Sequence, residues 1–349
     1  MLVSITSSTA QTPNTIMTVK MQTKANTLGD WAAIAIKKHL NKIIKHEDDV
    51  LADKSPEALH QMRVGMRRLR SAITGFAPAL DLPKPAKEKK IGDIARILGS
   101  LRDLDVLQEA LQNQYKPKLP AKEKKELETV LNQLEKQRIQ ALTEVQKTLE
   151  KGSYTSVKQS LKKWLKQPQF KEIAQMPIKE VLPDLLLPEV SKLLLHPGWL
   201  VGTQVKQGEI TQPELTPQKV EQVLAQGVEL HNLRKATKRI RYQMEVFEEF
   251  YTGSYQVYLK DMKSVQEILG QIQDGFVLSE FMTDALNLEM EKSFPTLTKQ
   301  LSHKSYQAWL QWQTLQRRYL NLEIRKGFHI AILQPNWGNI SNGRKFEHE

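Results

Sequence analysis

Two stretches of the chain place one histidine and a series of arginine or lysine residues at the spacing of a single helix face. The first stretch runs from His60 to Arg70, and the second runs from His231 to Arg241, 171 positions later. Neither stretch contains an acidic residue. Such a surface suits anion binding, because guanidinium groups form paired, charge-assisted hydrogen bonds with phosphate oxygens. It does not suit a metal ion, because the cations repel it and no carboxylate is present to bind it.

On an α-helix with about 100° between successive residues, the histidine and three cations of each stretch fall within an arc of about 80°. The first arc contains His60, Arg63, Arg67 and Arg70. The second arc contains His231, Arg234, Lys238 and Arg241. Apolar residues occupy the opposite side of both stretches, so each is predicted to be an amphipathic helix with a core face and a cationic face. Four further cations are secondary candidates for the same site: Arg68, Arg239, Arg102 and Lys235.

The whole chain carries an excess of positive charge. Its 349 residues include 51 Lys and Arg against 39 Asp and Glu, which gives a formal net charge of +12. This excess favours an anionic partner. The chain has no cysteine, so disulfides and thiolate metal sites are excluded. No apolar run is long enough to cross a membrane, and residues 1–27 lack the apolar core of a secretory signal, so a cytoplasmic location is expected.

The relation between the two stretches continues beyond them. With the same offset of 171, Leu98-Gly99 falls on Leu269-Gly270 and Asp103 falls on Asp274. A repeat that stays in register over roughly 48 positions indicates duplicated structural units. The two aspartates are also candidate catalytic carboxylates, but we expect each either to pair with a basic residue or to fix its helix. The two glycines, which cost a helix about 1 kcal/mol relative to alanine, are expected to permit close helix packing.

The rest of the sequence predicts further helices and shows no alternating pattern typical of a β-sheet. One helix is expected to begin at Asp30, and the first motif helix at Pro56 with Ser55 as its N-cap. Residues 121–166 are interpreted as one long helix or as two helices, and 185–195 as the first helix of the second half. A further break is expected at Gly227. The predicted fold class is all-α.

Proline content divides the chain into segments. Seven of its 16 prolines lie within residues 168–217. The prediction is a disordered tail (1–27), a first helical-bundle half (28–167), a proline-rich connection that includes the first helix of the second half (168–217), the remainder of that half (218–332) and a loose tail (333–349). Whether residues 1–27 belong to the native chain stays open.

Both motif helices share the pattern His-x-x-Arg-x-x-x-(Arg/Lys)-Arg-x-Arg, and each is followed by Leu-Gly-x-x-x-Asp. This pair of motifs resembles the CHAD family, the conserved histidine α-helical domain, over residues 28–330. The resemblance implies two four-helix bundles related by a pseudo-twofold axis, with the basic helices facing a central groove. It also implies non-catalytic binding of inorganic polyphosphate by the eight residues of the two arcs.

Two features of the sequence qualify this resemblance. The second copy has Lys238 and Gln273 where the first has Arg67 and Arg102, so the two halves are expected to bind less symmetrically. Some relatives carry a CYTH triphosphate-tunnel domain that opens with a Glu-x-Glu-x-Lys strand. The sequence has no such motif at the correct spacing, so a stand-alone CHAD protein is expected.

The expected function is therefore non-catalytic binding of inorganic polyphosphate in the cytoplasm, without metal or cofactor, and polyphosphate granules are a candidate partner. Two alternatives stay open. An enzyme acting on polyphosphate or nucleotide phosphates would need metal-binding carboxylates or a nucleophile beside the cations, and the motif supplies neither. A nucleic-acid-binding protein would add aromatic side chains for base stacking, which the arcs lack, so nucleic acid is expected to be a weak competitor. Protonation of the two histidines is expected to tighten binding mildly below neutral pH.

Overall fold

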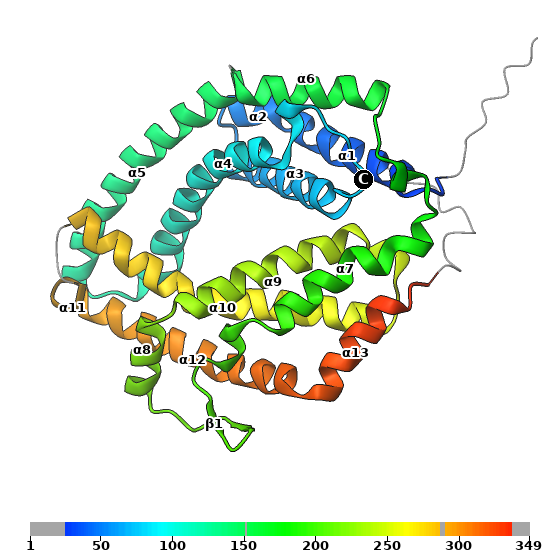
Figure 1. Ribbon diagram of the computed structural model, residues 1–349. Helices are drawn as coiled ribbons and strands as arrows, with labels where there is room; N and C mark the ends of the chain where they lie inside the picture. Colours follow the sequence, from blue (N-terminus) through cyan, green and yellow to red (C-terminus); the bar gives the residue numbers. More distant parts are fainter. Residues whose placement is uncertain (1–24, 151, 287–289, 337–349) are drawn as a thin grey trace, which may run out of the picture.

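The computed structural model describes residues 25–150, 152–286 and 290–336, and in these ranges the protein is all-α, as predicted (Figure 1). The helices of the first half are α1 (Leu28–Lys45), α2 (Glu47–Leu51), α3 (Pro56–Gly75), α4 (Glu88–Glu109), α5 (Ala121–Glu150) and α6 (Ser153–Lys166). Those of the second half are α7 (Ile178–Leu194), α8 (Pro217–Ala225), α9 (Val228–Val246), α10 (Ser254–Leu286), α11 (Met290–Ser293), α12 (Pro295–Leu320) and α13 (Leu322–Leu333). The two motif stretches are α3 and α9.

The starts of α1 and α3 follow from their capping residues. Thr27 caps α1, because its side chain accepts a hydrogen bond from Asp30 N at 3.1 Å and the Asp30 carboxylate accepts one from Thr27 N at 3.0 Å. The expected start at Asp30 was therefore wrong, and Asp30 is the third residue of the helix. Ser55 caps α3 with Pro56 at its first position, as predicted.

The helix breaks near two glycines agree with the sequence. Residues 121–166 form two helices, α5 and α6, and Gly152 between them has a φ of 87°, which favours glycine. The expected break at Gly227 is confirmed, because α8 ends at Ala225 and α9 begins at Val228. The motif helix α9 therefore starts without the side-chain cap that α3 has.

Two elements differ from the sequence interpretation. A short exposed hairpin is formed by strands β1 (Gln204–Lys206) and β2 (Glu209–Thr211). The sequence did not predict it, because strands of three residues are too short to show an alternating pattern. The helix α7 begins at Ile178 rather than near residue 185, and it contains Pro183 and Pro188. Each interior proline removes one helical hydrogen bond. Burial of the apolar face of α7 offsets that loss.

The expected tails lie mostly outside the described residues. Of 1–27 the structure describes only 25–27, and Thr27 belongs to the cap of α1. Of 333–349 it describes 333–336, where Leu333 ends α13 and Asn336 N donates a hydrogen bond to the Phe250 carbonyl at 2.8 Å. Among the described helices, none has the length and apolar character needed to cross a membrane.

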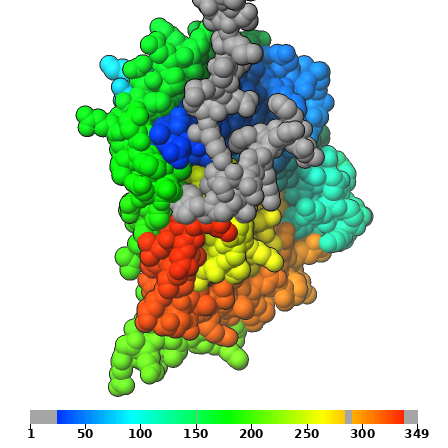
Figure 2. Space-filling view, turned by 90° about the vertical axis from the view of Figure 1, so that its right-hand side faces the viewer, coloured from blue at the N-terminus to red at the C-terminus, as the bar shows by residue number. Residues whose placement is uncertain are grey.

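The two halves build their packing in the same order. In the first half α1 packs against α3, α3 against α4, and α4 against α5. In the second half α7 packs against α9, α9 against α10, and α10 against α12. Helix α13 lies against α10 and α12 on the outer side, as the red, yellow and orange segments in Figure 2 show. The motif helices α3 and α9 are thus the central members of the two series.

The halves meet at both ends of the molecule. Helix α3 packs against α9, where Phe76 and Phe247 lie edge to face with ring centroids 5.1 Å apart. These residues are counterparts at the offset of 171, and contact between counterparts is what a twofold axis produces. At the other end α5 packs against α10, and the buried Glu123 carboxylate accepts hydrogen bonds from Thr296 N and Leu297 N at 3.0 and 3.1 Å. The division into two four-helix bundles stays a prediction.

Candidate functional site

A cavity of about 1390 Å³ lies between the two motif helices and the first part of α4. Ten cationic side chains line it: Arg63, Arg67, Arg70, Lys87, Lys89, Arg96, Lys171, Lys235, Lys238 and Arg239. Only three carboxylates accompany them: Asp81, Glu88 and Asp93. We call this space the cationic cavity. Its lining comes from both halves of the chain, and its excess of cations gives the space a positive electrostatic potential.

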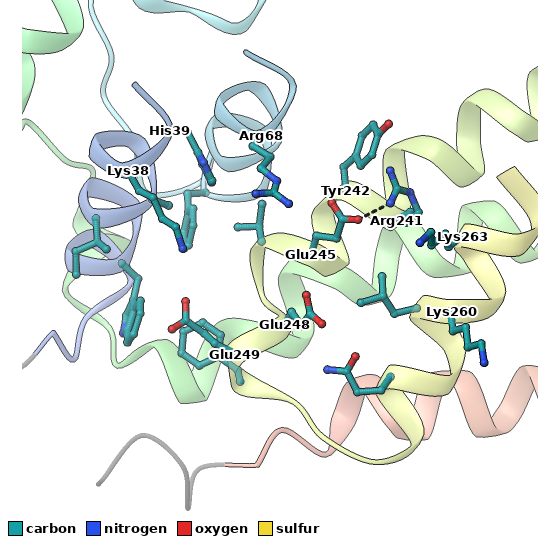
Figure 3. Close-up of a pocket in the computed structure, with 18 residues that line it drawn as sticks. Lys38, His39, Arg68, Arg241, Tyr242, Glu245, Glu248, Glu249, Lys260 and Lys263 are labelled. Carbon is teal, nitrogen blue, oxygen red and sulfur yellow. Dashed lines mark hydrogen bonds and ion pairs between the residues drawn. The ribbon is translucent and has the colours of Figure 1, made fainter. Parts of the chain in front are cut away.

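A second cavity, of about 620 Å³, lies between α1, α3, α9 and α10 (Figure 3). Five cations and one histidine line it: Lys38, Arg68, Arg241, Lys260, Lys263 and His39. Three glutamates face the same space: Glu245, Glu248 and Glu249. We call it the mixed cavity. Its cations are partly neutralised, and burial lowers the pKa of His39 to about 3, so this histidine adds no charge at neutral pH.

The cationic cavity brings together part of the predicted site. Of the eight arc residues, four line it: Arg63, Arg67, Arg70 and Lys238. Two of the secondary candidates, Lys235 and Arg239, do so as well. Arg241 and Arg68 line the mixed cavity instead. Four candidates line neither of these two cavities: His60, His231, Arg234 and Arg102.

Arg63 and Arg70 are held by carboxylates of the neighbouring helix α4. Arg63 Nη1 lies 3.1 Å from Asp103 Oδ1, which confirms the pairing expected for this aspartate. Arg70 donates from Nε to Glu88 Oε1 at 2.9 Å and pairs with the same carboxylate through Nη2. Both ion pairs are partly exposed, so each contributes little to stability. They orient the two guanidinium groups along the wall of the cavity.

Glycines on the neighbouring helices make room for arginines of the motif helices. A Cβ at Gly99 would lie 3.6 Å from Arg63 Nη2, and a Cβ at Gly270 would lie 3.3 Å from Arg234 Nε. The close packing expected at these glycines is therefore contact with an arginine side chain. Arg234 also donates a long hydrogen bond to Gln273 Oε1 at 3.4 Å. Asp274, unlike Asp103, has no cation within ion-pair distance among the described residues.

Arg67 and Lys238 differ from these residues because their charges are unpaired. Among the described residues, neither cationic group has an ion-pair or hydrogen-bond partner, and Arg67 Nε is buried without an acceptor. The Arg67 guanidinium carbon instead lies 4.2 Å from the centroid of the Tyr242 ring. Burial, followed by the charges of Arg234, Arg67 and Arg63, lowers the pKa of Lys238 to about 8. An anion in the cavity would supply the missing acceptors.

Arg241 and Arg102 are engaged by neighbouring side chains. Arg241 is buried, donates from Nε to Gln266 Oε1 at 2.9 Å and pairs with Glu245 through Nη1. Arg102 lies 3.9 Å from the buried Asp105, whose other oxygen accepts a hydrogen bond from Arg138. These contacts explain why two of the predicted cations point away from the cationic cavity.

The two motif histidines lie near the ends of the cationic faces. Burial lowers the pKa of His60, and Arg102, Arg67 and Arg63 lower it further, whereas Glu57 opposes them. The Nδ1 atom of His231 is buried and has no hydrogen-bond partner among the described residues. A phosphate-donor role for these histidines stays a prediction.

The sequence interpretation missed four of the cavity's cations and its tyrosine. Lys89 and Arg96 are seven residues apart on α4, with Gly92 between them, so they share one helix face. That spacing could have indicated their role. Lys87 precedes α4 as its N-cap residue, and Lys171 lies in the connection between the halves. Tyr242 adjoins the second arc, but a tyrosine next to Arg241 carries no signal of its own.

Comparisons with known proteins agree with this fold. The family model of the CHAD domain matches residues 34–283. The crystal structure of the CHAD domain from the plant Ricinus communis is similar, with a TM-score of 0.57 and 23% identity over 90% of this chain and 95% of that chain. PptA from Streptomyces chartreusis is similar with a TM-score of 0.58 and 14% identity, over 84% of this chain and 100% of that chain. No curated protein matches the sequence significantly.

Proposed function

The chain belongs to the CHAD domain family, and we propose that it binds inorganic polyphosphate in the cationic cavity, as a binding protein rather than an enzyme. The observation that carries this proposal is the cavity's lining of ten cations against three carboxylates. Arg67 and Lys238 are partly buried, and neither has a hydrogen-bond or ion-pair partner for its charge among the described residues. Both side chains line the cavity in which a ligand would lie.

The shape and charge of the ligand follow from this lining. Polyphosphate is a flexible chain with at least one negative charge per phosphate, so it needs cations distributed along an open cavity. The cationic cavity meets this need, because α3, α4 and α9 each contribute cations to it. Arginine forks can bind two phosphate oxygens at once. Affinity should fall steeply with salt concentration, because each phosphate contact releases counterions.

Nucleic acid is the second candidate, and the lining disfavours it. Tyr242 is the only aromatic residue among those that line the cationic cavity. The residue is 6% exposed and its ring is already in contact with two guanidinium groups, so it offers little surface for base stacking. In a competition assay, polyphosphate should displace DNA or RNA readily, and the reverse should be weak.

Release of orthophosphate in the presence of Mg²⁺ or Mn²⁺ would instead favour an enzyme. In the cell we expect the protein in the cytoplasm and at polyphosphate granules.

The test is a titration with long-chain polyphosphate at two salt concentrations. The repeat supplies a matched pair of variants, because Arg239 lines the cationic cavity and its counterpart Arg68 lines the mixed cavity. We expect Arg239→Ala to weaken binding and to lower the salt dependence by roughly one counterion, and Arg68→Ala to leave both near wild type.

Two double variants test the motif helices themselves. Arg63→Ala/Arg67→Ala and Arg234→Ala/Lys238→Ala each remove cations from one helix and should each weaken binding. Circular dichroism establishes that the variants are folded. Equal effects of Arg239→Ala and Arg68→Ala would place the ligand outside the cationic cavity. Weak, salt-independent binding by the wild type would refute the function itself.

A further inference from the structure

One aromatic ring stands at the boundary between the two cavities. Tyr242 lines both of them, whereas Arg67 lines only the cationic cavity and Arg241 only the mixed one. The guanidinium carbons of both arginines lie 4.2 Å from the centroid of the Tyr242 ring. Figure 3 shows Tyr242 beside Arg241 at the edge of the mixed cavity, with its hydroxyl directed away from Glu248 and Glu249.

The ring is the contact that fixes Arg67. Arg241 has two other partners, Gln266 and Glu245, so its position does not depend on the ring. Arg67 has no hydrogen bond or ion pair for its guanidinium group among the described residues. The face of an aromatic ring attracts a cation, and the attraction is larger where water is excluded. The Tyr242 ring therefore holds Arg67 and offsets its repulsion from Arg241.

The internal repeat supports this interpretation. At the offset of 171, Arg67 corresponds to Lys238 and Tyr242 corresponds to Ser71. The first half thus combines arginine with serine at these two positions, and the second half combines lysine with tyrosine. Both Lys238 and Ser71 line the cationic cavity. The planar guanidinium occurs at the position that faces a ring, and the lysine occurs at the position that faces none, as the stacking preference of arginine predicts.

We infer that Tyr242 is a positioning residue for polyphosphate binding: its ring holds the Arg67 guanidinium in the cationic cavity and separates that cavity from the carboxylates of the mixed one. This inference rests on the proposed function. On this inference, the contact with Tyr242 keeps the Arg67 guanidinium in the cationic cavity rather than in the neighbouring mixed cavity, which the motif helices also line.

The experiment is a double-mutant cycle between Arg67→Lys, which keeps the charge but not the planar fork, and Tyr242→Leu, which keeps bulk but removes the ring. Each single variant should weaken binding of long-chain polyphosphate about five- to tenfold. The double variant should be no weaker than the weaker single variant, because both changes remove the same contact. Tyr242→Phe keeps the ring and should stay within about twofold of wild type.

Arg239→Lys is the matched control, because Arg239 lines the same cavity without facing the ring. Its effect should add in full to that of Tyr242→Leu. Additive effects of Arg67→Lys and Tyr242→Leu, or unchanged binding by Tyr242→Leu, would overturn the inference while leaving polyphosphate binding intact. If Tyr242→Leu does not fold, Arg67→Lys and Arg239→Lys still decide, because at unchanged charge the first should weaken binding several-fold more than the second, and equal effects would overturn the inference. Absence of polyphosphate binding by the wild type would refute the proposed function, and this inference with it.

Discussion

The pH dependence of polyphosphate binding should report on Lys238. Its pKa is lowered to about 8 by burial and by Arg234, Arg67 and Arg63. In the free protein about nine tenths of the Lys238 side chains are therefore charged at pH 7, and about one tenth at pH 9. A bound polyanion neutralises the surrounding cations and raises the pKa of Lys238, so binding at high pH must first take up a proton.

The expected magnitude follows from these fractions. If the bound protein keeps Lys238 charged throughout, affinity falls about tenfold between pH 7 and pH 9. Calorimetric titrations in buffers with different ionisation enthalpies should show uptake of about half a proton per bound site at pH 8. Lys238→Arg keeps the charge over this whole range, because arginine does not titrate there. That variant should lose the pH dependence and the proton uptake.

Three results would refute this reasoning. A tenfold loss that persists in Lys238→Arg would assign the titration to another group. No proton uptake at pH 8 in the wild type would mean that Lys238 is already fully charged or does not meet the ligand. A rise in affinity with pH would contradict the sign, since a group that must gain a proton on binding can only weaken binding as protons become scarce.

Three further predictions concern the histidine, the joint between the halves and the glycines. Because burial lowers the pKa of His60, tightening of polyphosphate binding by its protonation should appear only below pH 6.5 and vanish in His60→Gln; equal affinity at pH 5.5 and 6.5 in the wild type would contradict it. Glu123→Ala removes the acceptor of one part-buried and one buried N–H group at the start of α12 and should lower the free energy of unfolding by about 2–3 kcal/mol in urea denaturation, whereas Glu144→Ala, at an exposed position of α5, should cost less than about 0.5 kcal/mol. Gly65→Ala should lower the melting temperature because its methyl group would lie 2.8 Å from an isoleucine side chain of α1, while Gly99→Ala, with its nearest contact at 3.6 Å, should raise it or leave it unchanged.

The sequence predicted the helices that carry the site because their signals are local. The capping serine and Pro56 mark the start of α3, and the spacing of its cations marks one face. The break at Gly227 and the pairing of Asp103 with a basic residue followed from the repeat. Signals of this kind depend only on residues within one or two turns, or on comparison of the chain with itself.

The composition of the cavity could not be predicted in the same way. A helical arc of 80° is an angle on one helix, and it does not show which neighbouring helix covers it. Arg241 belongs to the same arc as Lys238, yet Glu245 and Gln266 hold it in the other cavity. Lys171 reaches the cationic cavity from a connection that lies 96 residues after the end of α3 and 57 residues before the start of α9. Such contacts between distant segments are set by tertiary packing.

The repeat relates the linings of the two cavities. The two cavities use corresponding positions: Arg70, Lys89 and Arg239 in the cationic cavity are the counterparts of Arg241, Lys260 and Arg68 in the mixed one. A symmetric pair of sites was therefore available to this architecture.

The mixed cavity differs from the cationic cavity in its charge, because a few corresponding positions carry different residues. Thr74 lines the cationic cavity, and its counterpart Glu245 places a carboxylate in the mixed cavity and pairs with Arg241. Glu248 and Glu249, at the end of the same segment, add two more carboxylates. Carboxylates repel a polyanion, whereas Arg67 and Lys238 would attract it. On the proposed function, we therefore expect the two duplicated basic helices to serve a single binding site, the cationic cavity.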